Sequence, residues 1–112
     1  MRIHEMKLNC EPFTAVKSGS KTIEMRLYDE KRILIKQGDE IIFTNVTTGE
    51  TLRCLVLQLY VYPTFEELYL YHDKISLGYK LDEPANAKDM TVYYPQEKIE
   101  RYGVVGIEIR VL

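Results

Sequence analysis

The fold prediction depends most on one stretch of the sequence, Gly19-Ser20-Lys21-Thr22-Ile23-Glu24-Met25-Arg26-Leu27-Tyr28. Apolar and polar side chains alternate along it, with Ile23, Met25 and Leu27 on one face and Thr22, Glu24, Arg26 and Tyr28 on the other. A period of two is typical of a β-strand. We therefore predict a strand with a buried apolar face and with Glu24 and Arg26 facing outward. Replacing an outward Glu24 by Gln should change stability by under about 0.5 kcal/mol.

The residues before this stretch predict a strand and a short helix. The run 3–9 alternates in the phase of His4, Met6 and Leu8, as a half-buried strand does. Pro12 suits a first helical turn, Phe13 and Val16 form an apolar stripe, and Gly19 can adopt the left-handed conformation that ends a helix.

The residues after it predict further strands broken by short helices. The run 40–46 and the run 51–62 are rich in β-formers and are separated by a connection short enough for a hairpin. The remaining predictions are a helical turn or a loop at 29–36, a turn at 37–39, a capped helix from Thr64, irregular or briefly helical chain at 73–88, a helix at 95–101 and a closing strand at 105–111. This order favours an α+β barrel or sandwich with mixed pairing.

Composition predicts one soluble domain over residues 1–112, with 46% hydrophobic and 29% charged residues. No signal peptide or membrane span is evident, so we expect a cytoplasmic protein. The spacing typical of a metal site is absent from the two cysteines, Cys10 and Cys54, and from the isolated histidines, His4 and His72. We therefore expect no metal, no cofactor and no disulfide. The net charge of −2 argues against binding long duplex nucleic acid. The basic residues between Lys17 and Lys36 have two interpretations. They form a local contact for nucleic acid, or they form a solvated face that neighbouring acids neutralise.

The segment Gly19–Arg26 resembles the signature of the ASCH family, Gly-x-Lys-x-x-Glu-x-Arg, at all four fixed positions. Seven other segments resemble small bacterial ASCH proteins in the same order: Met6-Lys7-Leu8, Pro12-Phe13, Arg26-Leu27, Gly38-Asp39, Phe65-Glu66-Glu67-Leu68, Tyr93-Tyr94 and Tyr102-Gly103-Val104-Val105-Gly106-Ile107-Glu108. The resemblance covers nearly the whole chain.

The resemblance implies a PUA-like β-barrel with mixed, mainly antiparallel strands flanked by short helices. It also implies a cleft beside the barrel for RNA or a nucleotide-like ligand. Among members of the family are RNA-binding modules, a ribonuclease and an amidohydrolase branch acting on N4-acetylcytidine. That branch carries Thr where this chain has Glu24, and its catalytic glutamate comes from a later helix, in the region of Glu66 and Glu67.

The candidate site residues are charged or aromatic. Arg26 suits a phosphate, and Glu24 can accept hydrogen bonds from a base. Lys21 either contacts the ligand or, if it is partly desolvated, acts as a base or nucleophile. Its side chain can reach Glu24 and Arg26 only from the beginning of the strand. Tyrosine rings can stack on bases, and three of the nine tyrosines lie in segments that resemble the family: Tyr93, Tyr94 and Tyr102.

Three functions remain open on sequence alone. The first is binding of RNA or a modified nucleoside through Lys21, Glu24, Arg26 and a tyrosine. The second is hydrolysis of a nucleoside amide or of RNA, with Lys21 as base or nucleophile and Glu24 as proton relay. The third is a protein-interaction module. The sequence has no Gly-rich phosphate loop, GxSxG motif or His-centred relay.

Overall fold

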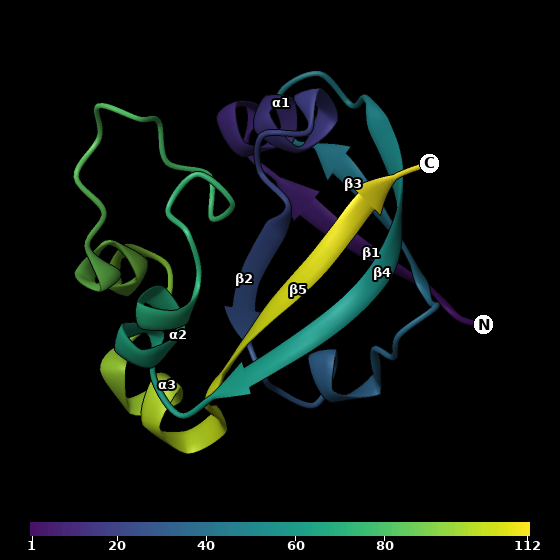
Figure 1. Cartoon of the computed structure of the whole chain (residues 1–112). Coiled ribbons are helices and arrows are strands. Elements are labelled where there is room, and N and C mark those ends of the chain that lie inside the picture. Colours follow the sequence, from purple (N-terminus) through teal and green to yellow (C-terminus); the bar gives the residue numbers. More distant parts are fainter.

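Five strands form one curled sheet in the computed structural model, which describes residues 1–112. In spatial order they are β1 (Ile3–Leu8), β3 (Glu40–Asn45), β4 (Thr51–Tyr62), β5 (Val104–Val111) and β2 (Ile23–Leu27) (Figure 1). β1 and β3 are parallel, and the other neighbours are antiparallel. The predicted strands, the hairpin and the mixed pairing are confirmed.

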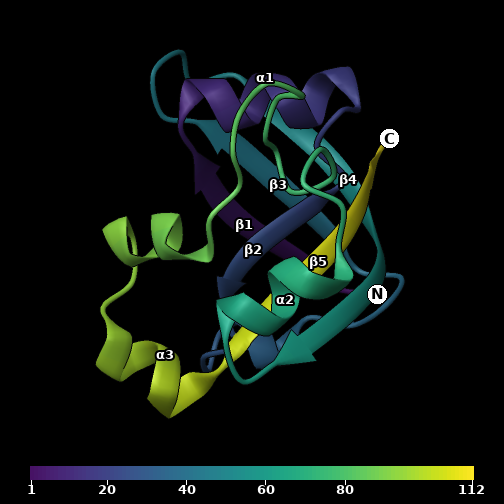
Figure 2. The same cartoon turned by 60° about the vertical axis from the view of Figure 1, so that its left-hand side comes forward.

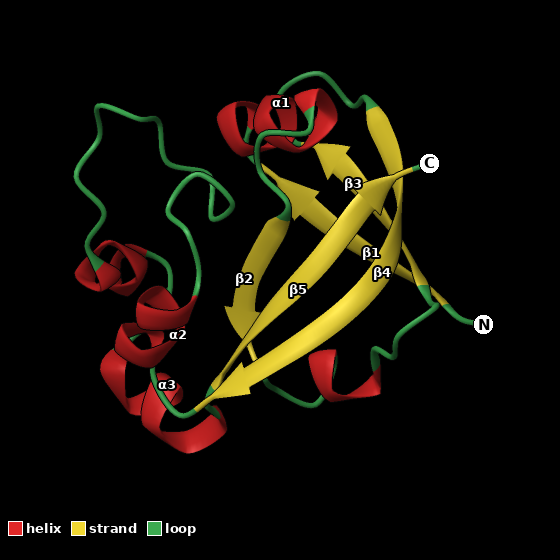
Figure 3. Ribbon diagram, viewed as in Figure 1, coloured by secondary structure: helices red, strands yellow, loops and turns green.

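The sheet curls into a half-barrel and leaves two strand edges unpaired. The long strand β4 pairs with β3 along its first part and with β5 along the rest, and a register shift between Val56 and Gln58 interrupts its pairing with β5. Such a bulge increases the local twist and bends the strand. β1 and β2 are the edge strands (Figure 3). We call the place where their unpaired edges face one another the seam.

Helices lie at both ends of the half-barrel and along its outer side (Figure 1 and Figure 2). They are α1 (Cys10–Ser18), α2 (Phe65–Tyr71), α3 (Gln96–Tyr102) and the short 3-10 helices η1 (Arg32–Leu34) and η2 (Ala87–Val92). The predicted helix signals are confirmed: Gly19 ends α1 with φ 88°, and the Thr64 side chain accepts from the Glu67 backbone N–H at 3.2 Å. None of the helices is long and apolar enough to cross a membrane.

Two hydrophobic clusters lie on opposite faces of the sheet. The first fills the concave face with side chains from β1, β3, β4 and β5 and with Phe13 and Val16 of α1. The second joins Ile23, Met25 and Leu27 of β2 to the buried faces of α2, η2 and α3. Gly106 allows this packing, because a Cβ there would lie 3.1 Å from Ile23 and 3.5 Å from Leu68. Both faces of β2 are therefore covered.

The two cysteines are free and lie in different environments. Cys10 is exposed at the start of α1, whereas Cys54 is buried in the first cluster. Burial raises the pKa of the Cys54 thiol to about 11. A thiol of this kind behaves as a small core hydrophobe.

The predicted turn at residues 37–39 is confirmed, and its Asp39 anchors the start of β1. Its carboxylate accepts from the backbone N–H groups of Arg2 (3.1 Å) and Lys36 (3.0 Å) and lies 2.9 Å from His4 Nε2. Burial opposes ionisation, but these hydrogen bonds outweigh it and lower the pKa of Asp39 to about 2. The ionised carboxylate thus stabilises the folded chain.

Replacing Asp39 by Asn should lower the free energy of unfolding by roughly 1–3 kcal/mol at neutral pH. Because the folded pKa lies below the ordinary value of 3.8, this contribution is complete above about pH 5 and disappears as the pH falls towards 2. Urea unfolding at pH 6 and pH 2.5 measures the difference between wild type and variant. It should shrink at the lower pH, and Asp82→Asn, an exposed acid, serves as control. A difference independent of pH would show that the carboxylate charge does not matter.

Candidate ligand-binding site at the seam

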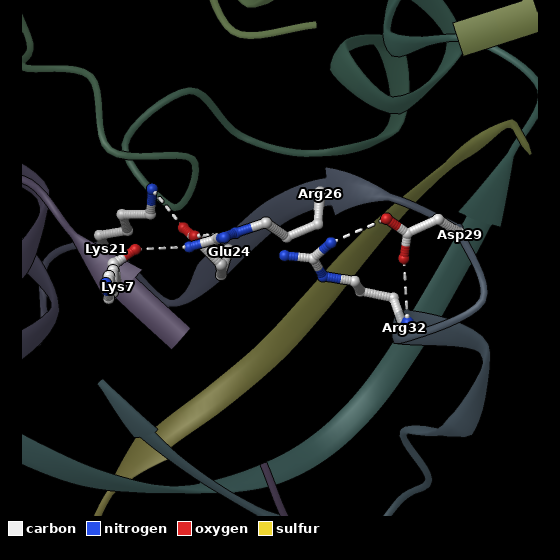
Figure 4. Close-up of polar contacts among 6 residues, drawn as sticks. All are labelled: Lys7, Lys21, Glu24, Arg26, Asp29 and Arg32. Carbon is white, nitrogen blue, oxygen red and sulfur yellow. Dashed lines mark hydrogen bonds and ion pairs between the residues drawn. The ribbon is translucent and has the colours of Figure 1, made fainter. Parts of the chain in front are cut away.

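The Glu24 carboxylate lies at the centre of a buried charged cluster (Figure 4). Lys21 Nζ is 2.9 Å from Glu24 Oε1, and Arg26 Nε donates to Glu24 Oε2 at 2.7 Å. Arg26 Nη2 also donates to the backbone carbonyl of Lys7 at 2.9 Å. Since Lys7 belongs to β1 and Arg26 to β2, this hydrogen bond crosses the seam. The three motif residues therefore form one connected unit between the two edge strands.

Lys21 reaches this unit from the chain that precedes β2. Its backbone N–H donates to the Ala15 carbonyl at the end of α1, and the next two N–H groups, of Thr22 and Ile23, donate to the Ser76 carbonyl. Gly78 lies against its side chain: a Cβ at Gly78 would be 3.0 Å from Lys21 Cδ. The helix end and the loop 76–78 hold Lys21 in place, so it joins Glu24 from the beginning of the strand, the one route that the sequence left open.

The prediction that Glu24 and Arg26 face outward is wrong. Their direct partners across to β5 are Ile107 and Val105, which belong to the cluster on the concave face. Paired residues on neighbouring strands point to the same side of a sheet, so Glu24 and Arg26 face the interior of the half-barrel. Their side chains are only 5% and 13% exposed. The outer face of β2 is the apolar one, which α2, η2 and α3 cover.

Burial and charge act in opposite directions on this cluster. Burial opposes ionisation of Glu24, but the nearby Lys21 and Arg26 outweigh it and lower the pKa of the carboxyl. Burial likewise disfavours the charged guanidinium, while Glu24 raises the pKa of Arg26 above its ordinary value. The cluster is therefore ionic, with two cations and one anion. The free-energy cost of removing water from a buried ion pair often offsets the attraction between its charges. Stability alone is therefore a weak explanation for the presence of this cluster.

Tyr94 is the tyrosine that accompanies the charged cluster. Its ring stacks on Phe65, with centroids 6.0 Å apart and planes 16° apart, and its hydroxyl makes no hydrogen bond within the chain. Burial raises the pKa of Tyr94, with Arg26 acting in the opposite direction and Glu24 adding to the rise. The hydroxyl thus lies within electrostatic range of the motif residues and is free to contact a further group.

The other two candidate tyrosines have different surroundings from Tyr94. Tyr93 precedes Tyr94; this residue is 62% exposed, and the centroids of the two rings are 6.4 Å apart. Tyr102, at the end of α3, packs against the second hydrophobic cluster beneath the Arg101 guanidinium. Glu66 lines a separate cavity of about 250 Å³ next to Phe65, and neither Glu66 nor Glu67 pairs with Lys21 or Arg26.

Sequence reasoning missed a second ion pair beside the motif. Arg32 Nη1 donates to Asp29 Oδ2 at 2.8 Å, and Asp29 Oδ1 accepts from the backbone N–H groups of Lys31 and Arg32 at 3.2 Å (Figure 4). Both side chains are less than one-fifth exposed, so the solvated-face interpretation does not hold for this pair. The only signal in the sequence was the i, i+3 spacing directly after a strand.

A cavity of about 330 Å³ adjoins this second ion pair. It is bordered by His4, Glu5 and Met6 on β1 and by Lys31, Arg32 and Leu34 at η1. Lys21, Glu24 and Arg26 do not line it. Arg32 lines the cavity, and its charge, like that of Arg26, acts to lower the pKa of Tyr94. The open cavity and the buried charged cluster thus both border β1, the cavity at Glu5 and Met6 and the cluster at the Lys7 carbonyl.

The family model of the ASCH domain matches residues 6–112. The chain belongs to the ASCH domain family. ASCH domains have a PUA-like fold that is associated with RNA binding, and the α+β half-barrel with short helices agrees with that fold. The matched residues include the segment Gly19–Arg26, three residues of which supply the buried charges.

Two solved structures share 35% of their residues with this ASCH domain. The crystal structure of hypothetical protein PH0355 matches with a TM-score of 0.83, covering 100% of both chains. The solution NMR structure of PF0455 from Pyrococcus furiosus matches with a TM-score of 0.75 over 98% of this chain and 97% of that one. A mutant of ZmASCH from Zymomonas mobilis shares the fold at 13% identity, with a TM-score of 0.69 over 97% of this chain and 68% of that chain. The comparison with curated proteins found no significant match.

Replacing Glu24 by Gln should lower the free energy of unfolding by about 3 kcal/mol, because Lys21 and Arg26 would remain buried without their counter-charge. Chemical denaturation monitored by tyrosine fluorescence measures this. The control is Glu50→Gln, whose exposed ion pair with Lys17 should contribute under about 1 kcal/mol. Equal, small losses in both variants would mean that the cluster is solvated rather than buried.

Proposed function

We propose that this ASCH domain binds a short single-stranded RNA or a nucleoside-like small molecule at the seam. The observation that carries the proposal is the ionic cluster of Lys21, Glu24 and Arg26, buried at the edge where the sheet does not close. An apolar pair would close a barrel at a lower desolvation cost. Costly charges with perturbed pKa values next to a cavity are typical of functional sites.

Each group has a proposed role. The Lys21 ammonium, already ion-paired with Glu24, can donate further hydrogen bonds to a base carbonyl or a ribose oxygen. The Tyr94 hydroxyl, which has no partner in the chain, supplies a second polar contact. The exposed ring of Tyr93 is placed for stacking on a base, an interaction that contributes about 1–3 kcal/mol per base. Glu24 and Arg26 orient these groups and hold the two strands together.

Charge limits the size of the ligand. The chain carries a net charge of −2, and binding to long nucleic acid depends on displacing counterions with many basic residues. The basic side chains near the seam are few and are partly neutralised by Glu24 and Asp29. A ligand of one or a few nucleotides fits this local charge.

Replacing Lys21 by Ala should weaken ligand binding roughly 10- to 100-fold, the loss expected for a hydrogen bond from a charged group. Lys21→Arg keeps the charge and should retain most of the affinity. Calorimetric titration with cytidine, N4-acetylcytidine and short RNAs of each base measures both variants, and Lys17→Ala on α1 is the control for an exposed lysine.

The same titration distinguishes binding from catalysis. A ligand bound equally well by wild type and Lys21→Ala would contradict the proposed contact. Hydrolysis of N4-acetylcytidine or RNA that disappears in a folded Lys21→Arg protein would instead make the domain an enzyme with Lys21 as base, because a guanidinium does not deprotonate near neutral pH.

A further inference from the structure

The cavity at η1 has features that the motif does not explain. Its border combines two basic side chains, Lys31 and Arg32, with the unpaired edge of β1. Its volume of about 330 Å³ is at the lower end of the range for small-molecule sites. The motif residues lie outside it, so a ligand that fills it would need groups beyond those that contact Lys21.

Arg32 is oriented before any ligand arrives. Asp29 holds it through one nitrogen, Nη1, and is itself fixed by two backbone N–H groups. The Nε and Nη2 groups make no hydrogen bond within the chain. A guanidinium held in this way has remaining donors in a planar fork, the geometry that suits a phosphate.

The unpaired edge of β1 supplies another donor. The carbonyls of Arg2 and Leu8 accept from Glu40 and Val46, so these even-numbered residues direct their backbone polar groups towards β3. By alternation the backbone N–H of Glu5 points to the unpaired edge, where Glu5 lines the cavity. The Lys31 ammonium forms no ion pair within the chain. Three kinds of donor therefore border the cavity: a guanidinium, a backbone N–H group and an ammonium group.

We propose that this cavity is a phosphate subsite, built by Arg32, Lys31 and the edge of β1, and that the ligand of the seam is therefore a nucleotide rather than a nucleoside. The inference rests on the proposed function, because it places the phosphate next to the base and ribose contacts at Tyr94 and Lys21. Asp29 is the positioning residue, since it acts through Arg32. The Glu5 carboxylate opposes an anion there and limits the affinity.

The test compares each nucleoside with its 5′-monophosphate: cytidine with CMP, and adenosine with AMP, by calorimetry at low salt. Wild type should bind the monophosphate at least tenfold more tightly. The preference should fall to about twofold or less in Arg32→Gln, be intermediate in Arg32→Lys and Asp29→Asn, and increase in Glu5→Gln. Arg110→Gln, an exposed arginine on β5, should leave it unchanged. Circular dichroism checks that each variant is folded.

Every outcome separates the two proposals. Equal binding of nucleoside and monophosphate, or a preference that survives Arg32→Gln, would overturn the phosphate subsite and leave the proposed function standing. Amide shifts of Lys31 and Arg32 on adding inorganic phosphate, with no change at Lys21 or Tyr94 on adding any nucleoside, monophosphate or short RNA, would support the subsite and refute the proposed function. Absence of binding by phosphate, nucleosides and monophosphates would overturn both.

Discussion

The pairing of Glu24 with two cations is the interaction on which the seam depends. A carboxylate that is 5% exposed needs counter-charges, and the chain provides them from both directions, with Lys21 before the strand and Arg26 within it. Once Arg26 is held by Glu24 through Nε, its Nη2 is directed at the Lys7 carbonyl on β1. One buried carboxylate therefore fixes the start of β2, the direction of Arg26 and the contact between the two edge strands.

The same arrangement links the fold to the proposed binding site. A half-barrel with unpaired edges exposes backbone donors and acceptors, which proteins usually cover or pair. Here the loop 76–78 covers the beginning of β2, Arg26 bridges its middle, and the cavity at η1 lies beside β1. The proposed ligand contacts thus all lie where the sheet is incomplete.

Much of this fold could be predicted from the sequence, because its signals are local. Alternation located β2 and β5, the short connection predicted the β3–β4 hairpin, and Gly19 and Thr64 marked helix ends. The motif also identified the charged cluster. Alternation separates two faces of a strand but cannot say which one helices will cover.

For that reason the direction of Glu24 was predicted wrongly. The helices and the aperiodic chain between His72 and Pro95 pack Leu77 and Met90 against the apolar face of β2, which places its charged face inside the half-barrel. The buried ion pair of Arg32 with Asp29 was not predicted for a related reason, because its burial depends on tertiary structure rather than on a local sequence pattern.

The most direct test of a ligand site at the seam is to map binding by amide chemical shifts on ¹⁵N-labelled protein, titrated with CMP and with a short single-stranded RNA. The account predicts changes concentrated at Glu5–Lys7, Lys21–Arg26, Lys31–Arg32 and Tyr93–Tyr94. Tyr71, at the end of α2, is 70% exposed and stacks on the half-buried Tyr62 of β4, and it provides an aromatic surface for comparison. Shifts centred on Tyr62 and Tyr71, with the seam residues unmoved, would contradict the account.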